Sequence, residues 1–215
     1  MADPRLFRLR VVFRKAGRLA LLSHLEVARA LERAVRRAHL PFAVSQGFSP
    51  HMRIAFGAAL PVGVGGTAEF FDVFLTTYVA PDKALRALQD AGVEDLGAIS
   101  CSYVEPKAPA ASVACPISTY EAVFDEPPGI IAVPETVTVT RKKKEKVLAV
   151  GDFLVGKPEL DNGTMTFTLE AKPTGSLRPD VFVSACVRAM VELGYLTPKA
   201  RVVSLTRTEQ RAAEA

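Results

Sequence analysis

All three histidines of the chain, His24, His39 and His51, lie between residues 22 and 61. An imidazole titrates near neutral pH, so each could act as a general acid or base. His24 falls close to the apolar side of the helix expected around it, where a partly buried structural histidine is more common than a catalytic one, and His39 should close that helix. His51 follows a loop that would present it, so it is the stronger catalytic candidate. Both His24 and His51 remain candidate catalytic residues.

Arginines form the second group of candidates. Ser23 and Glu26 make a capping-box pattern, which predicts a helix that begins at His24 and continues to about His39. The apolar side of this helix lies opposite an arginine side that carries Arg29, Arg33, Arg36 and Arg37. Because the guanidinium group pairs with phosphate and carboxylate better than an ammonium group does, this side is a candidate anion-binding surface. A solvated helix face without a ligand is the alternative.

We expect the first strand, the start of the helix and the loop after the helix to share one pocket. The loop returns to the helix start if the segment before it runs the length of the sheet. A helix N-terminus beside a basic turn would favour a phosphate or carboxylate there. The expected pocket residues are Lys15, His24, Ser45, Gly47, Phe48 and His51, and the binding set also includes Arg18, Ser23 and Arg53.

Other kinds of site have no support in the sequence. No phosphate-binding P-loop, dinucleotide-binding glycine motif or serine nucleophile elbow is present. The three cysteines, Cys101, Cys115 and Cys186, are far apart and share no C-x-x-C spacing, which argues against a disulfide framework and against a zinc or iron–sulfur site. We therefore expect this chain to bind no metal and no cofactor.

The composition is that of a globular protein: 49% of the 215 residues are hydrophobic, the net charge is +4 and the pI is about 9.0. A mild basic bias is compatible with an RNA or nucleotide partner but is shared by many proteins that have none. No apolar run approaches the roughly 20 residues that a membrane helix needs, and the N-terminus has no secretory signal pattern. We expect a cytoplasmic protein without membrane contact.

The first half of the chain, residues 1–105, predicts a β-α-β-β-α-β unit. Its expected strands cover residues 6–13, 53–59, 68–76 and 97–104, and its second helix covers 82–91, just after Pro81. In the first strand arginines alternate with apolar residues, so one strand face should be wet, with Arg8 and Arg10 on it. This order of elements is typical of a ferredoxin-like α+β fold with an antiparallel sheet.

The second half predicts a smaller α+β unit at residues 117–208, again with an antiparallel sheet. Residues 106–116, rich in proline and alanine, mark a linker before it, and residues 209–215 should form a frayed tail. Asp161-Asn162-Gly163 predicts a tight hairpin, and Pro179 begins the late helix. A secondary basic patch comprises Arg141, Lys142, Lys143, Lys144 and Lys146, for which an edge strand or hairpin tip is the more common explanation.

Several short motifs of the first half occur together in a known family. They are F-x-K-x-G at 13–17, L-S-H-L at 22–25, R-A-x-R-R-A at 33–38, L-P at 40–41, S-x-G-F-x-P-H at 45–51 and L-P-x-G at 60–63. This set resembles the radical SAM-linked protein family, a family of unknown function encoded beside, or fused to, a radical S-adenosylmethionine enzyme. The resemblance is close over residues 5–75 and weaker beyond. Glu26 and Met52 depart from the family pattern, which usually has aspartate and proline there, and Met52 loosens the loop after His51.

The resemblance implies a companion of the radical enzyme. Such enzymes hold an iron–sulfur cluster with a C-x-x-x-C-x-x-C motif, which this chain does not contain. The implied partner would supply S-adenosylmethionine and the cluster, and this chain, without catalysis of its own, would bind the substrate or dock on the enzyme. A ferredoxin-like sheet with arginine-lined faces is also a frequent RNA-binding scaffold, so we expect an RNA or ribosome-related substrate.

Two alternatives stay open. The chain could be an RNA-processing or RNA-modifying enzyme in its own right that uses His24 or His51. It could also be a structural interaction module that contacts no nucleic acid. A neighbouring gene for a cluster-binding radical enzyme would favour the accessory role over both.

Overall fold

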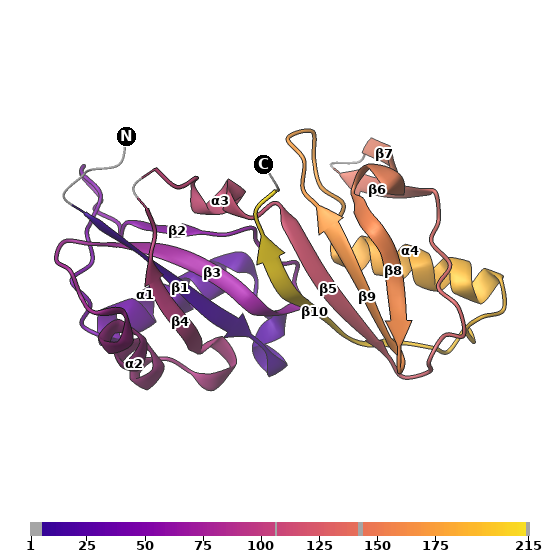
Figure 1. Ribbon diagram of the computed structural model, residues 1–215, viewed down its shortest axis with the longest axis horizontal. Coiled ribbons are helices and arrows are strands. Elements are labelled where there is room, and N and C mark those ends of the chain that lie inside the picture. Colours follow the sequence, from indigo (N-terminus) through magenta and orange to yellow (C-terminus); the bar gives the residue numbers. More distant parts are fainter. Residues whose placement is uncertain (1–5, 106, 142–143, 214–215) are drawn as a thin grey trace. The chain divides into compact units, whose positions relative to one another are not determined.

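The computed structural model describes residues 6–105, 107–141 and 144–213 of the chain (Figure 1). The chain divides after Cys115 into two compact units. The segment 106–116, expected as a linker, contains a short helix, α3 (Ala111–Ala114), that belongs to the first unit. Among the described residues, no helix combines the length and the apolar character that crossing a membrane requires.

The first unit is the predicted β-α-β-β-α-β arrangement. Its main elements are β1 (Phe7–Lys15), α1 (His24–Arg37), β2 (Ile54–Phe56), β3 (Gly65–Leu75), α2 (Pro81–Ala91) and β4 (Ala98–Tyr103), with short 3-10 helices η1 (Gly17–Leu21) and η2 (Glu94–Leu96). Within this unit the strands lie in the order β4-β1-β3-β2, and each neighbouring pair is antiparallel. This is the ferredoxin-like order, so the expected fold class is confirmed.

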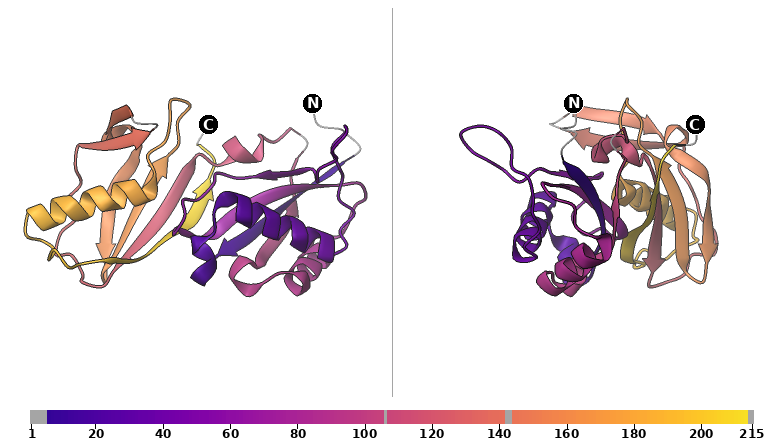
Figure 2. Two further views of the ribbon diagram at one scale, coloured as in Figure 1. Left: turned by 180° about the vertical axis from the view of Figure 1, so that it is seen from behind. Right: turned by 60° about the vertical axis from the view of Figure 1, so that its left-hand side comes forward.

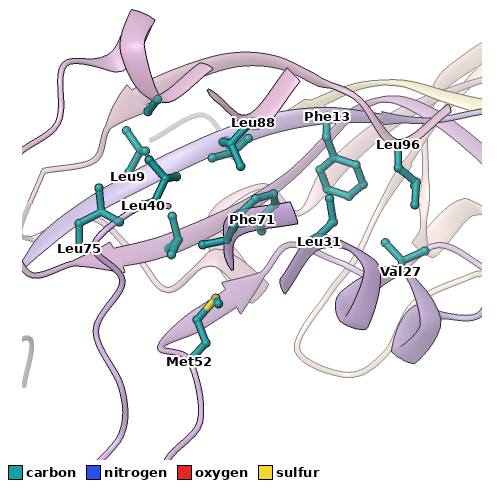
Figure 3. Packing of buried hydrophobic residues seen from close by; sticks show 14 residues of the cluster. Leu9, Phe13, Val27, Leu31, Leu40, Met52, Phe71, Leu75, Leu88 and Leu96 are labelled. Carbon is teal, nitrogen blue, oxygen red and sulfur yellow. The ribbon is translucent and has the colours of Figure 1, made fainter. Parts of the chain in front are cut away.

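One face of this sheet packs against both helices (Figure 2). Alternate residues of β1, such as Leu9 and Val11, point into the core because successive strand residues face opposite sides. The apolar side of α1, including Leu31 and Val35, meets them there. Figure 3 shows Leu31 and Leu9 within this cluster. Each fully buried aliphatic or aromatic side chain of this kind contributes about 1.5–3 kcal/mol to folding. This packing fixes which side of α1 faces outward.

The opposite face of β1 is not open to solvent at Arg8 and Arg10, the two arginines predicted to lie there. Asp72 of β3 is fully buried and accepts hydrogen bonds from both: Arg8 Nη2 at 2.6 Å and Arg10 Nε at 2.8 Å. Arg8 also donates to the carbonyl oxygens of Ala108 and Pro109, at 3.0 and 2.7 Å. The segment before α3 therefore crosses this face, and the expectation of a solvated strand face at these positions is wrong.

Helix α1 ends two residues before the predicted His39, in a Schellman motif. His39 N–H donates to the Arg36 carbonyl oxygen at 3.1 Å, and Leu40 N–H donates to the Val35 carbonyl oxygen at 3.4 Å. His39 adopts a φ of +52°, the left-handed conformation in which glycine is usual. The backbone of His39 thus terminates the helix.

Replacing His39 by glycine is expected to stabilise the protein by about 0.5–1 kcal/mol, because glycine adopts the left-handed conformation without steric cost. Urea unfolding of His39→Gly against the wild type measures the difference. His39→Ala is the matched control, since it removes the imidazole but keeps the Cβ atom and should show no gain. A His39→Gly variant less stable than the wild type would show that the imidazole itself stabilises the fold.

The second unit contains four antiparallel strands in the order β10-β5-β9-β8, a separate β6-β7 hairpin and one long helix. The elements are β5 (Ile117–Phe124), β6 (Thr136–Arg141), β7 (Lys144–Ala149), η3 (Val150–Asp152), β8 (Leu154–Asp161), β9 (Thr164–Glu170), α4 (Pro179–Glu192) and β10 (Val202–Arg211). The predicted hairpin joins β8 and β9, with positive φ at Asn162 and Gly163.

The described part of the predicted frayed tail is a strand as far as Arg211. Glu209 and Gln210 pair with Thr119 and Ser118 of β5. The prediction of a frayed tail was wrong because a polar sequence does not indicate a strand, whereas the backbone of this segment pairs with β5. Residues 214 and 215 lie outside the described part of the chain.

Candidate nucleic-acid interface

The outward side of α1 carries four exposed arginines, as predicted. Arg29, Arg33, Arg36 and Arg37 are all exposed, and the opposite side of the helix is buried at Leu31 and Ala34, which are 5% and 6% exposed. Within the described residues, no hydrogen bond or ion pair holds any of the four guanidinium groups. We call these four residues the arginine face.

The capping box fixes the start of this helix. The backbone N–H of Ser23 donates to Glu26 Oε2 at 2.8 Å, and the Ser23 hydroxyl donates to the same oxygen at 2.7 Å. These two hydrogen bonds are the main cause of the lowered pKa of Glu26. The only carboxylate on the first turn therefore caps the helix, and the nearby Arg29 lowers the pKa of Glu26 further.

The arginine face continues into a broad open groove of about 750 Å³ at the C-terminal end of α1. Arg36, Arg37 and His39 line one side, and Ala87 and Asp90 of α2 line the other. The lining of the groove combines two arginines with one carboxylate and three alanines, Ala38, Ala87 and Ala91. No local sequence pattern predicts this groove, because α1 and α2 are separated by two strands and meet only in the folded unit.

A second, much smaller pocket of about 20 Å³ lies at the start of α1. Lys15, His24, Phe56 and Glu69 are among its lining residues. The His24 ring meets the edge of the Phe56 ring at a centroid distance of 5.3 Å, and Lys15 Nζ donates to the Val64 carbonyl oxygen at 3.3 Å. The pocket brings Lys15 and His24 together as predicted, but its volume accommodates about one water molecule and no phosphate group.

The loop 45–51 lies at the other end of the sheet. Phe42 pairs with Leu75 at the end of β3, and the chain then turns at once, so it does not run along the sheet as the predicted pocket required. At about 3.3 Å per residue, the extended chain from His51 to Phe56 covers about 16 Å. The pocket that was to join Lys15 and His24 with Ser45, Gly47, Phe48 and His51 is therefore not formed.

Two hydrogen bonds close the loop 45–51 at its base. Ser45 N–H donates to the His51 carbonyl oxygen at 2.8 Å, and His51 N–H donates to the Ser45 hydroxyl at 3.0 Å. Phe48 is fully exposed, with a relative accessibility of 110%, so it does not fill the core. The loop stands away from the first unit as a free projection (Figure 2, right).

Cation–aromatic contacts flank this loop on both sides. Before it, the Arg36 guanidinium lies 5.1 Å from the centre of the Phe42 ring. After it, the Arg53 guanidinium lies 5.1 Å from the centre of the Phe74 ring. Arg18, the remaining residue of the predicted binding set, is exposed on η1, near the opposite end of α1.

The sequence model of one protein family, described as an uncharacterized protein conserved in bacteria (DUF2344), matches residues 8–179. The chain belongs to this family. The match starts in β1 and ends at the first residue of α4, so it contains the arginine face, the small pocket and the loop 45–51. The comparison with curated proteins finds no match.

Of the secondary basic patch of this DUF2344 chain, Arg141 ends β6 and Lys144 and Lys146 lie on β7, which agrees with the hairpin explanation of the basic run. Lys146 is exposed on β7. Lys142 and Lys143 lie outside the described residues, and the side chains of Arg141 and Lys144 are outside them as well.

Two of the three cysteines of this member of the DUF2344 family, Cys101 and Cys186, have thiols with raised pKa values. Burial raises the pKa of Cys101 to about 11 and that of Cys186 to about 12. Since the thiolate is the reactive form, both side chains are poor nucleophiles near neutral pH. Within the described ranges, no cluster of three or more His, Cys, Asp or Glu side chains is arranged to hold a metal ion.

Proposed function

We propose that this protein is a non-catalytic RNA-binding accessory module of a radical S-adenosylmethionine enzyme that modifies an RNA or ribosomal component. The observation that carries RNA binding is the arginine face. In the described residues no hydrogen bond or ion pair within the chain holds their guanidinium groups, and the one ring contact of the four, that of Arg36 with Phe42, occupies no N–H donor. They remain available to an anionic ligand.

The length of the arginine face fits a polyanion better than a single anion. Arg29 and Arg36 are seven residues apart, which corresponds to about 10 Å along the helix axis. A nucleic acid strand carries one phosphate per roughly 3.4 Å of helix axis, so a row of this length spans more than one phosphate. A small anion would instead need guanidinium groups that converge on one point, whereas these are spaced along the helix.

The sheet surface is a poorer candidate for the RNA contact. Ferredoxin-like RNA-binding domains commonly stack bases on the exposed sheet face. Here Arg8 and Arg10 on that face bind Asp72, and Arg10 also lies 4.3 Å from the centre of the Phe70 ring. Because the segment at Ala108 and Pro109 crosses the same face, α1 is the better site.

The proposed link to a radical enzyme rests on the motif set of residues 13–63, which resembles that of the radical SAM-linked family. Two exposed leucines, Leu21 and Leu25, are 67% and 66% exposed near the start of α1, next to the arginine face. Such an apolar site fits a protein partner better than RNA. The accessory role thus places RNA along the arginines and the enzyme near the leucines.

Co-purification from the native cell tests this proposal. We expect tagged wild-type chain to recover an RNA and a cluster-binding radical enzyme together. In the R29Q/R33Q/R36Q/R37Q variant the RNA should be lost and the enzyme retained, whereas Leu21→Ser with Leu25→Ser should lose the enzyme. Wild-type chain that recovers neither an RNA nor such an enzyme would contradict the proposal.

A further inference from the structure

We propose that the loop 45–51 stacks an unpaired base on Phe48, so that the ligand of the arginine face is single-stranded RNA. This inference rests on the RNA binding proposed above and adds the class of RNA. It starts from an unusual feature of the first unit: a phenylalanine ring that is completely exposed at the end of a projecting loop.

The loop that carries this ring is closed at its base. The two hydrogen bonds between Ser45 and His51 close its base, and a β-bridge between Val44 and Met52 lies directly behind them. Gly47, with a φ of +128°, allows the sharp turn just before Phe48. The Phe48 ring is thus presented on a loop whose two ends are joined by hydrogen bonds.

The chemistry of the loop suits a base. Residues 45–51 contain no lysine or arginine to form an ion pair with a phosphate and no carboxylate to repel RNA. Gln46, Ser49 and His51 are all exposed and can donate and accept hydrogen bonds with base edges. Unpaired bases are commonly bound by stacking on an aromatic ring together with such edge contacts.

The loop is continuous with the arginine face. Arg36 of that face stacks on Phe42, which is only three residues before Ser45. Arg53 follows two residues after His51 and lies over Phe74. A strand whose phosphates follow the arginine face would therefore reach the loop, and proteins that bind single strands combine cations along the backbone with aromatic platforms for the bases. In a duplex the bases are already paired and stacked, so Phe48 would gain no partner.

Affinity measurements with defined probes test the inference. The probes are oligoadenylate of about 12 nucleotides, within the usual site size of single-strand binders, and its duplex with oligouridylate. Phe48→Ala should weaken binding of the single strand by about 5- to 100-fold, the range expected for one lost base stack, and leave duplex binding unchanged. Phe48→Tyr should bind as the wild type does, and Val203→Ala, which removes another exposed apolar side chain, should have no effect.

A fluorescence measurement gives an independent readout. The chain contains no tryptophan, so Phe48→Trp introduces a single reporter at the loop. Oligoadenylate should quench this reporter by stacking and leave the reporter of Val203→Trp unchanged.

The outcomes separate this inference from the proposed function. If R29Q/R33Q/R36Q/R37Q loses the RNA while Phe48→Ala binds normally, the inference falls and the proposed function stands. If Phe48→Ala weakens the binding of single strand and duplex equally, the base-stacking inference is also overturned. A Phe48→Trp reporter that responds to the purified radical enzyme and not to RNA would assign the loop to a protein contact, and a wild-type chain that binds no RNA would overturn both proposals.

Discussion

Replacing all four residues of the arginine face by glutamine is expected to reduce the affinity for oligoadenylate on the order of 100-fold or more, because each hydrogen bond lost to a charged phosphate costs about 1.5–3 kcal/mol before solvent screening reduces it. The fold should be unaffected, since these side chains are exposed and point away from the core. Fluorescence anisotropy with labelled oligoadenylate measures the change. Glutamine is preferred to glutamate because it adds no negative charge near the C-terminal end of α1.

A variant with the same change in net charge serves as the control. K157Q/K172Q/K199Q/R201Q replaces four exposed cations of the second unit. This control should bind nearly as well as the wild type, because only a general effect of net charge is altered. If both variants lose the same affinity, binding depends on overall charge and the arginine face has no special role.

Replacing Asp72 by alanine is expected to destabilise the protein by about 3–5 kcal/mol, the largest effect on stability that we predict. Asp72 is completely buried, and its two oxygens accept hydrogen bonds from Arg8 and Arg10. Removing the carboxylate leaves two largely covered guanidinium groups, with side chains 13% and 20% exposed, without their counter-charge. Urea unfolding of the full chain, with hydrogen exchange in β1 and β3, measures the loss.

The triple variant R8M/R10M/D72L is the matched control. Replacing a whole buried ion cluster by apolar residues of similar size is often neutral or stabilising, so the triple variant should be far more stable than Asp72→Ala. A loss of less than about 1 kcal/mol in Asp72→Ala, the range typical of exposed ion pairs, would show that water reaches this cluster.

Local patterns in the sequence predicted the parts of the site that depend on a single element. The capping box at Ser23 and the 3.6-residue periodicity of α1 fix where the helix starts and which side carries the arginines. Both signals act within a few residues, so no knowledge of the rest of the chain is needed. The ferredoxin-like order followed in the same way from the succession of strand and helix patterns.

Contacts between distant residues could not be predicted. The prediction of a solvent-exposed face on β1 was wrong because of contacts that only folding makes. Asp72 and the carbonyl group of Ala108 lie 64 and 100 residues from Arg8 in the sequence. The prediction of one pocket shared by the helix start and the loop 45–51 was wrong because Phe42 pairs with the end of β3, where the chain reverses. The groove beside Arg36 was missed for a similar reason, since α2 supplies its other side.

The salt dependence of RNA binding tests the central claim most directly. For a single strand, the slope of log affinity against log salt concentration is about −0.7 for each phosphate contact, so loss of the four arginines should flatten the slope by about 3. We expect this change in R29Q/R33Q/R36Q/R37Q and an unchanged slope in K157Q/K172Q/K199Q/R201Q. Equal slopes for the wild type and the arginine variant would show that these four residues contact no phosphate, and would contradict an RNA interface on α1.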